Sequence, residues 1–249
     1  MRPRIAIPVP HSDQEYACRA LPQYERAVEM AGGEPVSIPL DRAPADLSKL
    51  IESCDAVLLP GSKADVDPAK FNAPRHEKTA ASDTRRDVVD ELLLQDAFNS
   101  RKPIMGICYG LQVLNVYRAG TLIQHLESTI NHAAGRAVPV AHQVIIEPDS
   151  KLAEIVGGRE AKVIPVNSSH HQSADVAGQA LRVVARCPTD GVIEALEGTS
   201  PDHFVLAVQW HPERSVDQDQ ASPALFRALV SAAGERRSRS PLRSNPASE

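Results

Sequence analysis

The chain has 249 residues, of which 42% are hydrophobic and 24% charged, so it is long enough to bury a core and has no bias toward disorder. Its net charge of -5 gives no electrostatic reason to expect a nucleic acid or an anionic membrane as partner, because both favour a basic protein face. We therefore expect a small neutral or zwitterionic ligand.

Strands and helices alternate over the first half of the chain. Apolar runs of strand length are each followed by a segment with helical spacing of apolar residues. Parallel strands need crossover connections, which bring helices over both faces of a sheet. We therefore predict a three-layer, doubly wound α/β fold with a mostly parallel sheet. The expected strands are 4–9, 34–40, 55–61 and 102–107, and the expected helices are 21–33, 44–54, 84–98 and 109–117.

The second half of the chain has a different pattern. Beyond Tyr117, shorter β-like runs separated by turn residues predict additional C-terminal β-hairpins that extend the sheet. A closing helix is expected over 222–234, which ends a single domain over 1–234. The polar segment 235–249 is rich in Ser, Arg and Pro and is predicted to be a flexible tail. The β-like runs are 142–148, 161–167, 180–187, 191–198 and 203–210.

The N-terminus and the cysteines predict a cytoplasmic protein. The first residues contain only a short apolar segment interrupted by prolines, which is not the pattern of a secretory signal peptide. No window approaches the roughly 18 apolar residues of a membrane span. The four cysteines follow no disulfide or metal spacing, which is typical of free thiols in a reducing compartment. They are Cys18, Cys54, Cys108 and Cys187.

The stretch "GICYG" places a cysteine between two glycines where a predicted strand becomes a helix. Side chains at Gly106 and Gly110 would obstruct the tight, exposed turn that this junction requires around Cys108. The thiol would then stand at a helix N-terminus, where unpaired N–H groups favour a thiolate and the N–H of Tyr109 can help to bind an oxyanion. The alternative is that Cys108 is a small buried hydrophobe, and the motif alone leaves both interpretations open.

His211 is the histidine best placed to serve this thiol as a base. It follows the predicted strand 203–210, and open α/β sheets place their sites beyond the carboxyl ends of strands. Glu213, held by the intervening proline, can fix the tautomer of the imidazole and stabilise the imidazolium. Taken alone, a surface His-Pro turn is the simpler interpretation. Combined with Cys108, the pair predicts a Cys-His-Glu triad.

A small-residue turn after the strand 55–61 completes the constellation. Gly61 and Ser62 can offer a backbone N–H to the oxygen of a tetrahedral intermediate, although a plain turn is the alternative. Nucleophile, base, orienting acid and oxyanion donors together fill the roles that acyl transfer requires.

Several ordered segments carry a family resemblance. The segments "LPGSKADVDP", "TRRDVVDELLL" and "PIMGICYGLQVLNVYRAGTLIQHL" resemble the Pro-Gly-Gly loop, the Arg-Asp helix and the nucleophile elbow of the γ-glutamyl-γ-aminobutyrate hydrolase (γ-glutamyl hydrolase-like, peptidase C26) family. This family belongs to the class I glutamine amidotransferase-like superfamily. The segments "VNSSHHQSAD", "TDGVIEALEG" and "VLAVQWHPE" follow in the order that the family shows. The resemblance covers nearly the whole chain and implies a flavodoxin-like fold.

The resemblance also implies roles for individual residues. It makes Cys108 the nucleophile, His211 the base and Glu213 its orienting acid. The oxyanion donors would be Tyr109 and the Gly61-Ser62 turn. The residues assigned to the substrate side are Gln112, Asn167, Ser169, His170 and His171.

The implied activity is hydrolysis of a γ-glutamyl amide through a glutamyl thioester, giving glutamate and an amine without any cofactor. The implied partner is a small γ-glutamyl substrate, with no nucleic acid and no membrane. A homodimer is compatible with the sequence but not indicated by it. Two alternatives remain open. Tyr109 stands where the hydrolases usually have Arg, which favours a glutaminase subunit that supplies ammonia to a separate synthetase. A catalytically silent protein that binds a γ-glutamyl metabolite is the second alternative.

No metal site is predicted. The adjacent His170 and His171 would point to opposite faces of a strand, and the neighbouring carboxylates lack ligand spacing. Glu194 is expected either to hydrogen-bond near the site or to be an exposed strand carboxylate. Arg85 and Arg86 are expected on a solvated helix face. The three cysteines outside the elbow are expected to be packing residues.

Overall fold

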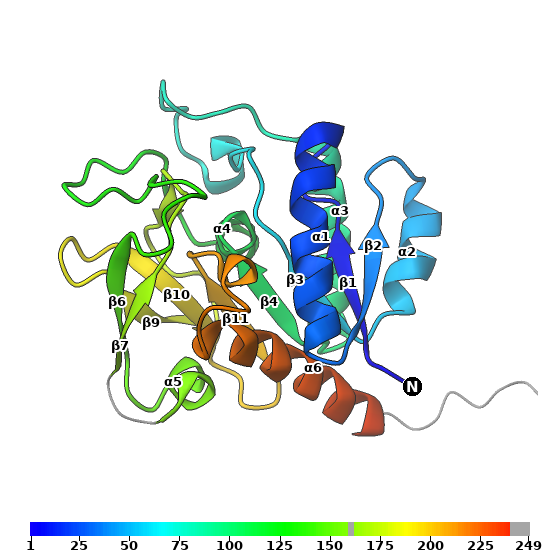
Figure 1. Cartoon of the computed structure of the whole chain (residues 1–249). Coiled ribbons are helices and arrows are strands. Elements are labelled where there is room, and N and C mark those ends of the chain that lie inside the picture. Colours follow the sequence, from blue (N-terminus) through cyan, green and yellow to red (C-terminus); the bar gives the residue numbers. More distant parts are fainter. Residues whose placement is uncertain (159–161, 240–249) are drawn as a thin grey trace, which may run out of the picture.

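A nine-stranded mixed sheet forms the centre of the computed structural model, which describes residues 1–158 and 162–239 (Figure 1). The strands of this sheet are β1 (Arg4–Pro8), β2 (Glu34–Ile38), β3 (Ala56–Leu59), β4 (Ile104–Ile107), β6 (His142–Ile146), β7 (Lys162–Val166), β9 (Leu181–Arg186), β10 (Ile193–Gly198) and β11 (Val205–Val208). Their order is β2-β1-β3-β4-β11-β10-β9-β6-β7. The pairs from β2 to β11 are parallel, and those from β11 to β7 are antiparallel. A separate two-stranded sheet consists of β5 (Leu122–Ile123) and β8 (Ser173–Ala174).

Helices cover both faces of this sheet. Along β1, the side chains of Ile5 and Ile7 enter one buried cluster and that of Ala6 enters the other, because successive strand residues point to opposite faces. The helices α1, α5 and α6 pack on the first face, and α2, α3 and α4 pack on the second. This arrangement confirms the predicted three-layer α/β fold. The helices are α1 (Gln14–Met30), α2 (Pro44–Glu52), α3 (Thr84–Asn99), α4 (Tyr109–Tyr117), α5 (Lys151–Val156) and α6 (Ala221–Arg239), with 3-10 turns η1 (Pro68–Phe71) and η2 (Pro212–Arg214).

The strand β11 differs from the expectation of a hairpin that extends the sheet. It pairs antiparallel with β10, but it also lies parallel to β4 with Val208 opposite Ile107. The N–H of Cys108 donates to the carbonyl of Val208 at 2.8 Å. The carboxyl ends of β4 and β11 are therefore neighbours, which brings residue 108 and the segment after β11 to the same edge.

Two helix boundaries lie more than one residue outside the predicted ranges. The helix α1 begins at Gln14 rather than residue 21, because the Asp13 side chain caps it by accepting from the N–H of Tyr16. The helix α6 continues to Arg239, beyond the predicted domain end at 234. Arg236 and Arg237 hold this last turn through bonds to the carbonyls of Ser100, Met1 and Arg2. The rest of the predicted tail, 240–249, lies outside the described residues.

Among the described helices, none has both the length and the apolar character needed to cross a bilayer.

Arg86 is buried, so the expectation of a solvated helix face is wrong for this residue. Its side chain is 0% exposed, and its Nε donates to Asp90 Oδ1 at 2.7 Å. Its Nη1 and Nη2 donate to the carbonyls of Pro10 and Pro60 at 2.9 and 3.1 Å. The guanidinium therefore ties α3 to the loops that follow β1 and β3, next to Gly61.

We expect Arg86→Leu to lower the free energy of unfolding by about 3–5 kcal/mol. The substitution leaves the buried carboxylate of Asp90 without its partner and removes the donors from two carbonyl groups. Urea denaturation followed by circular dichroism measures the loss. The exposed neighbour provides the control, since Arg85→Leu should stay within about 0.5 kcal/mol of the wild type. Equal stability of the two variants would contradict the prediction.

Candidate active site

Cys108 occupies a strained turn between β4 and α4. Its φ of 53° and ψ of -106° lie in a region that non-glycine residues rarely adopt. A Cβ on Gly106 would lie 2.8 Å from the backbone of Gly110, and a Cβ on Gly110 would lie 2.1 Å from the carbonyl oxygen of Leu59. Both flanking glycines are thus required for the turn, as the sequence predicts.

The turn places the Cys108 residue, 5% exposed, immediately before the first helical turn of α4. The N–H groups of such a first turn have no acceptor within the helix, and that of Tyr109 is the first of them. The side chain of Tyr109 points away from the sulfur. Its ring packs on the guanidinium of Arg86 at 5.3 Å, and its hydroxyl donates to Asp87 Oδ1 at 3.0 Å. Only the backbone of Tyr109 therefore fits the predicted oxyanion role.

His211 and Glu213 form the expected pair. The Nδ1 of His211 lies 2.8 Å from Glu213 Oε1, and both side chains are buried. Burial alone would lower the pKa of His211, but the Glu213 carboxylate and the Cys108 sulfur outweigh it and raise this pKa to about 9. Among the described residues the Nε2 atom is buried and has no partner in strict hydrogen-bond geometry, but the Cys108 sulfur is near enough to contribute to the raised pKa of the ring.

The carboxylate of Glu213 is held in its charged form. Burial opposes that charge, but His211 and then Arg214 keep the pKa of Glu213 below its ordinary value. The Nε of Arg214 lies 3.4 Å from Glu213 Oε1, and its Nη1 donates to the hydroxyl of Ser169 at 2.8 Å. Ser169, which was assigned to the substrate side, therefore helps to hold Arg214 against the carboxylate of Glu213.

Asn167 fixes the backbone of His211. Its Nδ2 donates to the carbonyl of His211 at 2.9 Å, and its Oδ1 accepts from the N–H of His211 at 3.0 Å. Both bonds are buried. The side chain of Asn167 thus holds the His211 backbone, and its assignment to the substrate side stays a prediction.

Gly61 lies next to both His211 and Cys108. A Cβ at this position would lie 3.0 Å from His211 Cε1 and 3.7 Å from Cys108 Cβ. Its N–H donates to the hydroxyl of Tyr24 at 3.0 Å, so this predicted oxyanion donor already has a partner. The hydroxyl of Ser62 accepts from the N–H of Ala64 at 3.2 Å and closes the turn.

Tyr24 is one of the residues at the site that were not predicted from the sequence. It is buried on α1, and its helical spacing with Ala20 and Ala27 indicates a core face. That spacing gives no sign that its hydroxyl reaches the loop after β3. Burial, followed by the charge of Glu213, raises the pKa of Tyr24 well above its ordinary value, so the phenol stays neutral.

Of the remaining predicted residues, Gln112 lies on α4, and His170 and His171 lie on the loop before β8. The Nε2 of Gln112 donates to the carbonyl of Gln172 at 3.1 Å. The side chains of His170 and His171 diverge, but the two residues lie in a loop and not on the strand that was expected. His171 Nε2 lies 3.1 Å from Asp65 Oδ1, whereas His170 points inward to Glu194, which is fully buried rather than exposed.

The other cysteines divide into two kinds. Cys54 and Cys187 are buried, and burial raises the pKa of each thiol, in agreement with a packing role. Cys18 is exposed on α1, so the expectation of packing is wrong there.

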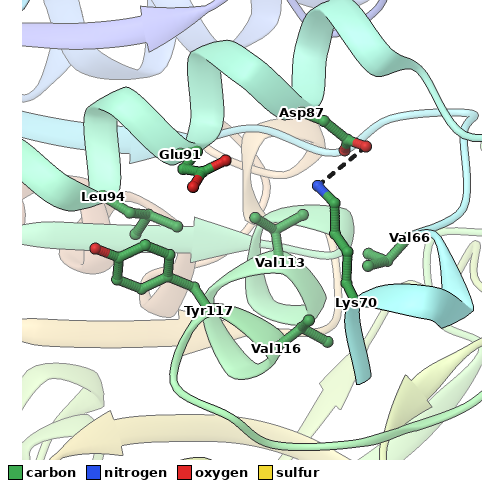
Figure 2. A pocket seen from close by; sticks show the side chains of 8 residues that line it. All are labelled: Val66, Lys70, Asp87, Glu91, Leu94, Val113, Val116 and Tyr117. Atoms are coloured by element: carbon green, nitrogen blue, oxygen red, sulfur yellow. Dashed lines mark ion pairs between the residues drawn. The ribbon is translucent and has the colours of Figure 1, made fainter. Parts of the chain in front are cut away.

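A pocket on the outer side of α4 lies apart from the triad (Figure 2). An ion pair of 3.0 Å between Lys70 Nζ and Asp87 Oδ2 crosses it. Asp87 also accepts a hydrogen bond from the hydroxyl of Tyr109, whose side chain points away from the Cys108 sulfur. The lining residues of this pocket do not include Cys108, His211 or Glu213. The lining residues are Val66, Lys70, Asp87, Glu91, Leu94, Val113, Val116 and Tyr117.

Comparisons with known proteins agree with this geometry. The family model described as Peptidase C26 matches residues 8–213. The γ-glutamyl-γ-aminobutyrate hydrolase of Escherichia coli K12 is 34% identical over 220 residues, which is 84% of each chain. A Mycobacterium tuberculosis protein with a provisional glutamine amidotransferase name is 40% identical over 214 residues, 84% of this chain and 66% of that protein.

A solved structure shows the same fold. It comes from Thermoplasma acidophilum, is named provisionally as one of the subunits of GMP synthase, and aligns with a TM-score of 0.65. The alignment covers 96% of this chain and 97% of that one at 15% sequence identity, so the likeness concerns architecture alone.

Proposed function

Because the chain belongs to the peptidase C26 family and is a γ-glutamyl hydrolase-like enzyme, we propose that it cleaves γ-glutamyl amides of small amines, giving glutamate and the amine. The observation that supports this most is the Cys108 turn beside the His211–Glu213 pair, with 2.8 Å between Nδ1 and Oε1. The reaction is assigned to the cytoplasm, where an unpaired nucleophilic thiol stays reduced.

In the first half-reaction, the Cys108 sulfur attacks the γ-carbonyl carbon and a C–S bond forms. The carbonyl oxygen becomes an oxyanion, which the N–H of Tyr109 at the start of α4 is positioned to stabilise. The protonated His211 then gives its Nε2 proton to the amide nitrogen while the C–N bond breaks. The amine leaves, and a glutamyl thioester remains on the sulfur.

In the second half-reaction, water attacks the thioester carbonyl while His211 takes a proton from it. The C–S bond breaks, glutamate leaves, and the sulfur and the imidazolium return to their starting forms. Glu213 supports both steps because its negative charge stabilises the imidazolium in each cycle.

We expect Glu213→Gln to move the alkaline limb of the pH profile of kcat/KM downward by about 1–3 pH units. The native His211, with a pKa raised to about 9, stays protonated as the pH rises from 6.5 toward 9. Loss of the Glu213 charge removes the largest of the effects that raise this pKa, so the proton is lost at lower pH. An unchanged alkaline limb in the variant would show that Glu213 does not set the protonation of His211.

A panel of amides tests the proposed reaction. The panel contains glutamine, γ-glutamyl-γ-aminobutyrate, other γ-glutamyl amines and one α-glutamyl isomer, with release of glutamate as the readout. We expect the protein alone to hydrolyse γ-glutamyl amines larger than glutamine and to leave the α-isomer intact.

Two outcomes would favour the alternatives. Release of ammonia from glutamine only after addition of a partner would indicate a glutaminase subunit, which the tyrosine after the nucleophile favours. Failure of a glutamine-analogue electrophile to modify Cys108, together with tight binding of γ-glutamyl compounds, would indicate a silent binding protein.

A further inference from the structure

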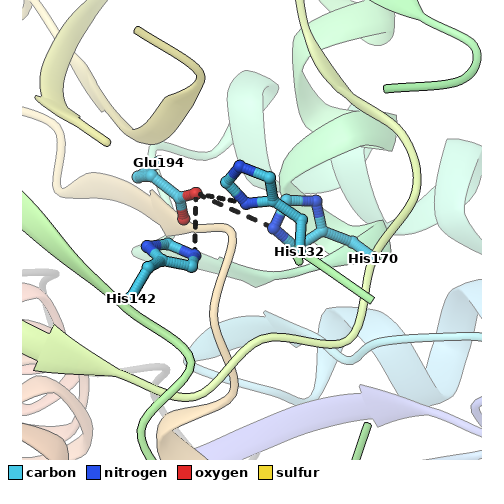
Figure 3. A group of neighbouring side chains, drawn as sticks. All are labelled: His132, His142, His170 and Glu194. Atoms are coloured by element: carbon cyan, nitrogen blue, oxygen red, sulfur yellow. Dashed lines mark ion pairs between the residues drawn. The ribbon is translucent and has the colours of Figure 1, made fainter. Parts of the chain in front are cut away.

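We propose that the chain binds one structural zinc ion through three imidazoles and one carboxylate, at a buried site distinct from the catalytic triad. The ligand atoms come from the loop before β6, the start of β6, the loop before β8 and the strand β10, and they all lie within 4.8 Å of one another. Figure 3 shows the four side chains pointing toward a common centre. The ligands are His132, His142, His170 and Glu194.

The distances from Glu194 Oε1 to the three ring nitrogens are close to those of a metal site. The Oε1 of Glu194 lies 3.3 Å from His132 Nδ1, 3.4 Å from His142 Nε2 and 3.8 Å from His170 Nε2 (Figure 3). In a tetrahedral zinc site with metal–ligand distances of about 2.0–2.1 Å, neighbouring ligand atoms lie about 3.3–3.4 Å apart. Two of the three distances already match, and the third requires only a small movement of one ring.

The outer nitrogen of each ring has an acceptor that fixes its tautomer. His142 Nδ1 lies 3.1 Å from the carbonyl of Gln143, and His170 Nδ1 lies 2.9 Å from that of Gln172. A carbonyl only accepts, so both nitrogens carry the proton. His132 Nε2 lies 2.8 Å from the carboxylate of Asp190. Such hydrogen bonds to carbonyls and carboxylates are the usual support of metal-binding histidines.

The inner nitrogens of His142 and His170 therefore present lone pairs to the carboxylate of Glu194. These two nitrogens, the Nδ1 of His132 and both oxygens of Glu194 are buried and have no partner in good hydrogen-bond geometry among the described residues. Lone pairs and a carboxylate repel one another unless a cation lies between them. A single proton shared between two of these atoms leaves the others unsatisfied. Each unsatisfied buried group lowers the stability of the folded state by about 1–3 kcal/mol. One metal ion satisfies all of the ligand positions at once.

The chemistry of the donor set favours zinc. Imidazole nitrogen and carboxylate oxygen are ordinary zinc ligands, and four protein ligands without an open position are typical of a structural site. A pocket lined by the 125–133 segment and by His170 and His171 provides an entry path.

Hydrogen bonds also connect the proposed zinc site to the catalytic residues. The carbonyl of Gln172, which accepts from His170, also accepts from Gln112 one turn after Cys108. The same loop carries Asn167, which holds the backbone of His211. A metal ion at this position would fasten the loop and so keep the catalytic base in place.

Metal content and spectroscopy of the full chain test the proposal. We expect about one zinc ion per chain by elemental analysis after purification, and a thermal midpoint that falls with chelator and recovers with added Zn²⁺. Co²⁺ in place of Zn²⁺ should give the intense visible bands of a tetrahedral site. The proposal would be overturned if the protein neither contained nor took up Zn²⁺, or if it bound Co²⁺ with the weak bands of an octahedral site. Neither measurement needs a variant, and neither depends on amide hydrolysis.

Variants identify the ligands. We expect His142→Ala and Glu194→Gln to weaken Zn²⁺ binding by about 100-fold or more. His171→Ala is the matched control, since its ring turns to Asp65, and it should bind Zn²⁺ like the wild type. A second group, His132, Cys187 and Asp190, shares one ring with the proposed site. Loss of Zn²⁺ in Cys187→Ser but not in Glu194→Gln would overturn the assignment in favour of that group.

Discussion

Cys108→Ala is expected to lower kcat for γ-glutamyl amide hydrolysis by about 10⁴-fold or more, because it removes the atom to which the glutamyl group becomes attached. The substitution changes little else. The side chain of Cys108 is small and nearly buried, and alanine keeps the Cβ that the turn already accommodates. Single-turnover assays with the best substrate of the panel measure the loss, and trapping with a glutamine-analogue electrophile shows whether a covalent adduct still forms.

The control for this variant is Cys18→Ala, which removes an exposed thiol on α1. Its activity should stay within about twofold of the wild type, and it should still gain the mass of one electrophile. Cys108→Ala should gain none and should unfold at nearly the wild-type denaturant concentration. If Cys108→Ala keeps a substantial fraction of the activity, the reaction does not proceed through a thioester on this sulfur.

The elbow was predictable because its constraints are local. Two glycines four residues apart around Cys108 mark a place where Cβ atoms do not fit, and a Cβ on Gly106 would lie 2.8 Å from the backbone of Gly110. Helical spacing of apolar residues likewise marks the helix α3 within one residue. Such signals depend on neighbours in the chain, so one sequence carries them.

The insertion of β11 beside β4 was not predictable in the same way. Its apolar run fits a hairpin strand as well as a parallel central strand, because both bury their faces. The choice depends on the pairing of Val208 with Ile107, which are 101 positions apart in the chain. His211 could nevertheless be predicted as the partner of Cys108, since the family resemblance links the two residues without requiring that pairing.

The buried polar groups were the least predictable part of the structure. Arginine is a residue type usually found at the surface, and the burial of Arg86 depends on the carboxylate of Asp90 and on the carbonyls of Pro10 and Pro60. His142 and Glu194 stand on different strands with no ligand spacing between them. Three-dimensional assembly, rather than spacing, creates both the Arg86 contacts and the proposed zinc site.

Gly110→Ala is expected to lower the free energy of unfolding by about 5 kcal/mol or more, enough to prevent accumulation of folded protein in a marginally stable chain. The added Cβ would lie 2.1 Å from the carbonyl oxygen of Leu59 and 2.8 Å from its carbonyl carbon. The strand β3 has no room to retreat, because it pairs with β1 on one side and β4 on the other. The helix α4 would have to move outward and carry the Cys108 turn with it.

Gly234→Ala separates this steric effect from the general effect of replacing a glycine. Gly234 lies inside α6, and a Cβ there would meet only Pro3 Cγ at 3.7 Å, an ordinary contact. Alanine at this position should raise the free energy of unfolding by about 0.5–1 kcal/mol, because it restricts the unfolded chain and favours the helix. Opposite signs for the two variants in urea denaturation are therefore the expected result. A folded Gly110→Ala protein within about 1 kcal/mol of the wild type would mean that α4 does not contact β3 closely enough to fix the turn that holds the nucleophile.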